Sequence, residues 1–88
     1  MIQREVLVCN RLGLHARAAA KLVQLANQFQ SQVSVSTNHM SADAKSILGV
    51  LTLAAAKDTS LVVEVTGPDE KEAVEKIEAL IKAKFGEE

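Results

Sequence analysis

The chain has 88 residues, enough for one small domain that buries about 60–65% of the surface its unfolded chain would expose. Hydrophobic residues make up 48% of the sequence, aromatic residues only 2%, and the formal net charge is −1. These values exclude a second domain and argue against a nucleic-acid binder, which would present basic patches and aromatic stacking platforms. The core must therefore be aliphatic.

Cys9 is the only cysteine, so an intrachain disulfide is impossible and a reducing compartment is expected. We interpret Cys9 as a small apolar residue at the end of a strand. The first residues lack a charged leader followed by an apolar stretch. The longest apolar run, 47–56, reaches only half the length, about 20 residues, that a membrane span needs. We therefore expect a soluble, cytoplasmic protein.

From Ile2 to Val8, side chains would alternate between two sides of the chain, which predicts a first strand. Residues 10–13 then form the connection to a helix. We expect this helix to run from about Ala16 to about Asn27. Its buried side is predicted from apolar residues that recur every three to four positions: Ala18, Leu22, Val23, Ala26 and Phe29. The alanines on its outer side either leave room for a partner or reflect the high helix propensity of alanine.

The middle of the chain predicts a short hairpin and a second helix. Residues 33–37 alternate between two faces, one of them formed by serines, which predicts a second strand with one polar face. We expect Asn38-His39 to form a tight turn into a third strand around 40–43. We expect His39 to be a solvated turn residue. Ser46 precedes apolar residues at helical spacing, which predicts a helix N-cap, and 57–59 end that helix.

The last part predicts a fourth strand over 60–66 and a third helix after the break at Gly67-Pro68. Asp69 and Glu72 have the spacing of a capping box. The buried stripe of the helix is predicted from its apolar residues: Ala73, Val74, Ile77, Leu80 and Ile81. We interpret 86–88 as a helix stop and a short acidic tail.

The predicted order is strand, helix, strand, strand, helix, strand, helix, without a long linker or repeat. Such an order favours an α+β fold in which one mostly antiparallel sheet is covered by helices on one face. The half-polar second strand fits a sheet whose other face meets water. We expect a single domain over 1–88. His15, His39 and Cys9 lack the spacing of metal ligands, so we expect no metal site.

Gly13-Leu14-His15-Ala16-Arg17 places an imidazole and a guanidinium where the first helix begins. The unpaired N–H groups and positive dipole of a first turn favour a bound anion such as phosphate, and Arg17 adds a fork of donors. The same surroundings favour the neutral, nucleophilic imidazole of His15. We therefore expect a phosphoryl group carried covalently on His15. The alternative is a histidine that only caps the helix beside an exposed arginine.

This stretch, a second motif over 45–50 (Lys-Ser-Ile-Leu-Gly-Val) and the element order together resemble the HPr family, the histidine-containing phosphocarriers of the bacterial phosphoenolpyruvate-dependent phosphotransferase system. The resemblance covers essentially the whole chain. It implies an open-faced β-sandwich of order βαββαβα, with four antiparallel strands and three helices on one side. It also implies a phosphoryl carrier without cofactor, not an enzyme.

The resemblance assigns roles to three side chains. His15 would take phosphate on Nδ1 from phosphorylated enzyme I and pass it to an EIIA-type domain, while Arg17 would stabilise the transferring charge. Ser46 would be a regulatory serine, the target of HPr kinase/phosphorylase. A phosphoserine adds about −2 charge and would repel an acidic partner. For Ser46, a plain N-cap is the alternative.

The resemblance also implies a docking surface across the starts of the first and second helices. Its residues are Leu12, Ala16, Ala20, Ile47, Leu48 and Leu51, each of which could instead belong to the core. Ala18 stands where the family usually has proline, which is compatible with a first turn but not required there. Gln24 and Asn27 replace expected lysines, so docking should depend more on apolar contact than on charge. We expect a monomer with transient partners.

Two other readings differ in function. A nitrogen-branch (NPr-like) carrier would share the His15 site but regulate proteins. A small anion-binding regulatory module would use His15 and Arg17 to hold a ligand without phosphoryl transfer. An acylphosphatase-like enzyme ranks last, because the sequence lacks a glycine-rich phosphate loop.

Overall fold

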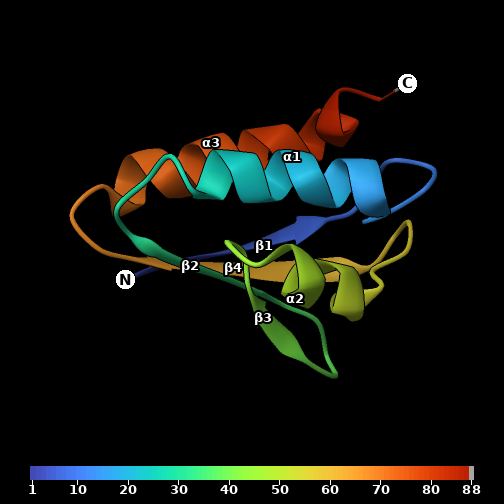
Figure 1. Ribbon diagram of the computed structural model, residues 1–88, viewed down its shortest axis with the longest axis horizontal. Coiled ribbons are helices and arrows are strands. Elements are labelled where there is room, and N and C mark those ends of the chain that lie inside the picture. Colours follow the sequence, from blue (N-terminus) through green and yellow to red (C-terminus); the bar gives the residue numbers. More distant parts are fainter. Residues whose placement is uncertain (88) are drawn as a thin grey trace.

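Four strands join into one antiparallel sheet with the spatial order β1-β4-β2-β3 (Figure 1). The computed structural model describes residues 1–87. The strands are β1 (Ile2–Leu7), β2 (Gln32–Ser36), β3 (Ser41–Asp43) and β4 (Ser60–Thr66). In the register, Val6 of β1 lies opposite Leu61, and Val33 of β2 lies opposite Val65. The first and last strands in the chain are therefore neighbours in the sheet.

Three helices cover one face of this sheet, which confirms the predicted α+β, βαββαβα fold. They are α1 (Ala16–Ala26), α2 (Ile47–Leu53) and α3 (Glu70–Lys82), and a 3₁₀ turn, η1 (Lys84–Gly86), follows α3. α1 and α3 lie side by side above the sheet, whereas α2 packs beside β3 and contacts α1 (Figure 1). No helix within residues 1–87 combines the length and the apolarity required to cross a bilayer.

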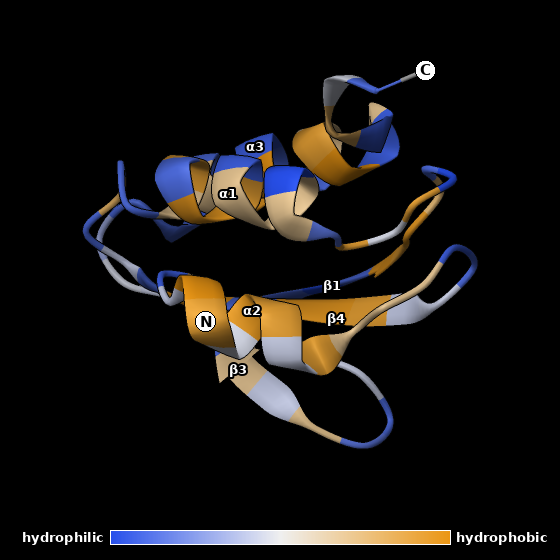
Figure 2. Ribbon diagram, turned by 45° about the vertical axis from the view of Figure 1, so that its right-hand side comes forward, coloured by the Kyte–Doolittle hydropathy of each residue, from blue (hydrophilic) through white to orange (hydrophobic). Residues whose placement is uncertain are grey.

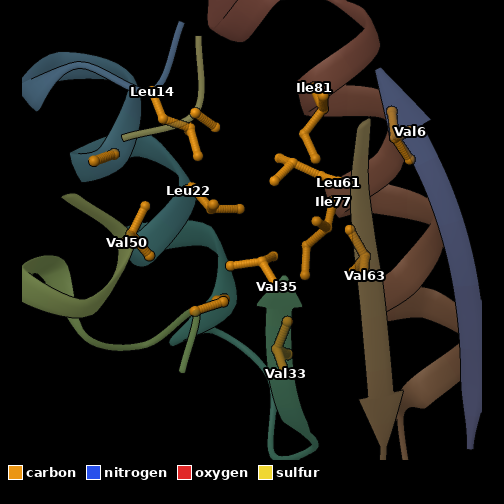
Figure 3. Packing of buried hydrophobic residues seen from close by; sticks show 14 of the residues in the cluster. Val6, Leu14, Leu22, Val33, Val35, Val50, Leu61, Val63, Ile77 and Ile81 are labelled. Atoms are coloured by element: carbon orange, nitrogen blue, oxygen red, sulfur yellow. The ribbon is translucent and has the colours of Figure 1, made fainter. Parts of the chain in front are cut away.

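The core between the helices and the sheet is aliphatic, as expected from the composition (Figure 3). Alternate residues of the central strands point into it and meet side chains of α1 and α3. The labelled core residues include Leu22, Val33, Val35, Leu61, Val63, Ile77 and Ile81. Of the predicted buried stripes, only Val23 and Leu80 are partly exposed. The two phenylalanines, Phe29 and Phe85, are buried just beyond α1 and α3.

The end of α2 differs from the prediction. The helix stops at Leu53 because Ala54 adopts a left-handed conformation, with φ of 50°, and its N–H donates to the carbonyl of Leu51. The expected stop at 57–59 instead forms part of the loop before β4. Helices commonly end on a left-handed residue, but glycine usually takes that place. An alanine gives no such signal in the sequence.

The predicted capping box at the start of α3 is wrong. The carboxylate of Asp69 makes no cap hydrogen bond and instead accepts from the N–H groups of Gln30 (2.9 Å) and Ser31 (3.0 Å) and from the Ser31 hydroxyl (2.5 Å). The hydroxyl of Ser31, followed by the Gln30 amide, lowers the pKa of Asp69. Glu70 accepts from the N–H of Gly67 instead. Asp69 therefore connects the loop after α1 to the start of α3.

We expect Asp69→Asn to lower stability in a pH-dependent manner. Because the folded pKa of Asp69 lies below its unfolded value, its stabilisation is present above about pH 4 and disappears as the pH falls through the folded pKa. Urea denaturation from pH 7 to pH 2 should give the wild type a larger free energy of unfolding than Asp69→Asn at neutral pH, and this difference should disappear in acid. Asp58→Asn, at an exposed loop position, is the control. A difference in free energy of unfolding that stays constant with pH would contradict a stabilising role for the ionised Asp69 carboxylate.

Candidate functional site

His15 lies at the start of α1 with both ring nitrogens engaged. Its backbone is extended (φ −78°, ψ −178°), and its Nδ1 accepts the N–H of Arg17 at 3.3 Å, so the imidazole is the N-cap of the helix. An amide N–H only donates, so in this geometry Nδ1 presents a lone pair. The side chain is 26% exposed. The ring is thus both a helix cap and accessible to a partner.

The loop before His15 is fixed by a close approach at Gly13. This residue has φ of +67°, and a Cβ at its position would lie 2.4 Å from the carbonyl oxygen of Ala55. The next N–H, that of Leu14, donates to the same oxygen at 2.8 Å, and the Leu14 side chain is buried in the core. Only glycine accommodates this conformation and contact. The segment after α2 therefore determines where His15 sits.

Glu87 contacts His15, which the sequence interpretation missed. Its Oε2 lies 2.5 Å from Nε2 of His15, and its Oε1 accepts from Nδ2 of Asn10 at 3.0 Å. The Glu87 side chain is only 13% exposed. The hydrogen bond from Asn10 is the main cause that lowers the pKa of Glu87, and His15 and Arg17 add to it. Glu87 of the expected acidic tail thus belongs to the site, while Glu88 lies outside the described residues.

Consecutive left-handed residues turn the chain back toward α1. Lys84, Phe85 and Gly86 have φ of 60°, 56° and 75°. The Phe85 side chain is fully buried, and its carbonyl accepts from Nζ of Lys21 at 2.7 Å. η1 contacts α1 and lies near the end of α1 where the helix begins (Figure 1). A phenylalanine followed by glycine after a charged helix end was the available signal for an anchored tail.

Arg17 lies beside this network in an electropositive pocket. The pocket has a volume of about 250 Å³ and is lined by Arg11, Leu12, Arg17, Lys21, Gly86 and Glu87. Arg17 is exposed, and its charge acts on the Glu87 carboxylate. Three cationic side chains and the N-terminus of α1 surround one carboxylate. The arrangement suits an anion that approaches His15 from solvent.

Ser46 and the apolar residues near α2 lie on the surface. The Ser46 hydroxyl accepts from the N–H of Gly49 at 3.2 Å, so the predicted N-cap is confirmed. Leu48 is 74% and Leu12 62% exposed, Ala16, Ile47 and Leu51 are also exposed, and Ala20 is half-buried. None of these belongs to the core, and most of α2 is coloured as hydrophobic in Figure 2. Within residues 1–87, no three His, Cys, Asp or Glu side chains form a metal cluster.

Residues 2–83 match the family described as "PTS HPr component phosphorylation site". The chain belongs to the HPr family. It is 53% identical to phosphocarrier protein HPr of Cupriavidus necator over 99% of this chain and 98% of that one. It is 40% identical to phosphocarrier protein NPr of Shewanella violacea over 98% and 94% of the two chains. The crystal structure of HPr from Thermoanaerobacter tengcongensis superimposes with a TM-score of 0.96 at 39% identity, covering 100% and 99%. The phosphocarrier prediction is therefore confirmed, and the relatives support the HPr-type function better than the NPr-like one.

We expect Gly13→Ala to destabilise the protein by more than about 1 kcal/mol, because the new Cβ would be strained at positive φ and would meet the Ala55 carbonyl. Thermal denaturation measures the loss, and NMR shifts of the His15 ring report displacement. Gly49→Ala, at a helical position, is the control because its Cβ would meet mainly side-chain atoms. A Gly13→Ala protein with the melting temperature and ring shifts of the wild type would contradict the claim that the contact between Gly13 and Ala55 positions His15.

Proposed function

We propose that His15 is the phosphoryl carrier residue, and that it accepts phosphate through Nδ1 from phosphorylated enzyme I and passes it to EIIA-type domains. The observation that carries this proposal is the N–H of Arg17 directed at Nδ1, which leaves a lone pair on that nitrogen at the start of α1. The chain then acts as a stoichiometric carrier, and no free substrate is turned over. An anion-binding module without transfer would not require a nucleophilic nitrogen.

The transfer follows from the groups around the ring. The Nδ1 lone pair attacks phosphorus, and the donor's bond to phosphorus breaks with its electron pair remaining on the donor. As Nδ1 bonds to phosphorus, the Arg17 N–H is released and becomes a donor for a phosphoryl oxygen. The guanidinium of Arg17 and the helix dipole stabilise the negative charge on the phosphoryl group. Arg17 thus contributes both its backbone and its side chain.

The proposed docking surface is the exposed apolar patch beside His15: Leu12, Ala16, Ala20, Ile47, Leu48 and Leu51. A partner that covers this patch would bury the phosphoryl group away from water while transfer proceeds. Ser46 lies at the edge of the patch, and its exposed hydroxyl is our candidate for modification by HPr kinase/phosphorylase. A phosphate there would add charge to an otherwise apolar contact and weaken binding.

Incubation with phosphoenolpyruvate and enzyme I should add the mass of one phosphoryl group, lost in mild acid, to the wild-type protein. His15→Ala should gain none. His39→Ala, which removes an exposed histidine in the β2–β3 turn, should gain it like the wild type. Intact-mass spectrometry measures all three proteins. Phosphorylation of His15→Ala, or none of the wild type by active enzyme I, would reject His15 as the carrier.

Leu48→Ala should weaken binding to enzyme I by roughly tenfold, since truncation of a buried interface anchor typically costs 1–2 kcal/mol. Its melting temperature should stay close to wild type because the side chain is 74% exposed in the free protein. Leu7→Ala, which truncates an exposed leucine on β1, is the matched control. Titration calorimetry gives both affinities. Equal binding by the two variants would place the docking surface elsewhere.

A further inference from the structure

The two oxygens of Glu87 have separate partners, which fixes the direction of the carboxylate. Oε1 accepts from Asn10, whose side chain is fully buried and also donates to the carbonyl of Gly13 at 2.8 Å. Oε2 is then directed at Nε2 of His15. An ionised carboxylate only accepts hydrogen bonds, so in the neutral ring Nε2 is the nitrogen that carries the proton. The hydrogen bonds at Nε2 and Nδ1 therefore select the same tautomer.

We propose that Glu87 is a positioning residue for phosphoryl transfer: its carboxylate holds the proton on Nε2 of His15 and thereby keeps Nδ1 as the nucleophile. This inference rests on the proposed transfer at His15. Without Glu87, the ring could place its proton on Nδ1 in a fraction of molecules. That fraction would be unable to attack through Nδ1, and the helix cap from Nδ1 to Arg17 would also be lost.

The same contact compensates charge during the reaction. When the Nδ1 lone pair bonds to phosphorus, the donor's bond breaks, no proton leaves the ring and Nε2 keeps its hydrogen. The ring acquires a positive charge in this step, and Glu87 lies beside it as the counter-ion. When the phosphoryl group moves to the acceptor, the electron pair of the phosphorus–nitrogen bond returns to Nδ1 and the ring becomes neutral. The carboxylate therefore assists transfer in both directions.

The end of the chain is built to hold Glu87 in this place. Buried Phe85 anchors the turn, and Lys21 secures its carbonyl. Left-handed conformations at Lys84 and Phe85 are uncommon for residues other than glycine and are maintained by these contacts. The charged side chains that line the pocket next to Glu87 are Arg11, Arg17 and Lys21. Each is basic, so the surroundings favour the carboxylate form that the proposal requires.

The test compares Glu87→Ala and Glu87→Gln with the wild type in the full chain. Glu87→Ala removes both the acceptor and the charge, and we expect phosphoryl acceptance from enzyme I to slow by about tenfold. Glu87→Gln loses the charge and offers only one acceptor oxygen to the two donors, Asn10 and Nε2–H, so its rate should also fall, by roughly threefold or more. Glu75→Gln, on the exposed side of α3, should match the wild type. Rapid-quench kinetics gives the rates.

A second readout follows the tautomer in the unphosphorylated proteins, through the ¹⁵N shifts of the His15 ring. Wild type should carry the proton on Nε2, whereas Glu87→Ala and Glu87→Gln should both shift toward a mixture of tautomers. A fast Glu87→Ala, or a slow one with the wild-type tautomer, would overturn the role of Glu87 while His15 phosphorylation stands. A wild type that never gains phosphate on His15 would overturn both proposals.

Discussion

The imidazole of His15 is held at its two nitrogens by groups that select one tautomer. A backbone N–H at the start of α1 meets Nδ1, and the carboxylate of Glu87 meets Nε2. Because one group only donates and the other, when ionised, only accepts, the ring has a defined lone pair and a defined proton. Phosphoryl chemistry requires this distinction, since a ring with both nitrogens protonated is not a nucleophile. The remainder of the fold can be understood as the means of bringing these two groups together.

That assembly depends on the antiparallel pairing of β1 with β4, the first and last strands of the chain. The pairing places the loop after β1 and the turn after α3 at one end of the molecule (Figure 1). Gly13 approaches the backbone after α2, and Phe85 is buried in the core, so contacts other than those with His15 hold both segments in place. Asp69 connects α3 to the loop after α1 through Gln30 and Ser31. Rigid elements thus position a site that lies almost wholly in loops and termini.

Short sequence patterns correctly predicted those features that depend on interactions between residues close together in the sequence. The strand alternation, the N-cap at Ser46 and the start of α1 at Ala16 agree with the structure because each depends on neighbours in sequence. Asp69 was misassigned because its spacing to Glu72 suits a cap, whereas tertiary partners almost forty residues away bind its carboxylate. Glu87 was missed for the same reason, because its partners Asn10 and His15 are distant in sequence. Of the candidate site, the placement of His15 and Arg17 at the start of α1 was thus predictable, and the contact with the Glu87 carboxylate was not.

We propose that Nδ1 of His15 is the nucleophile while Nε2 keeps its proton beside Glu87. The most direct measurement is NMR of the ¹⁵N-histidine-labelled protein after phosphorylation, which reports which ring nitrogen is coupled to ³¹P and which carries hydrogen. We expect coupling of phosphorus to Nδ1 and a proton on Nε2. Coupling to Nε2, or a phosphoryl group on any residue other than His15, would contradict it.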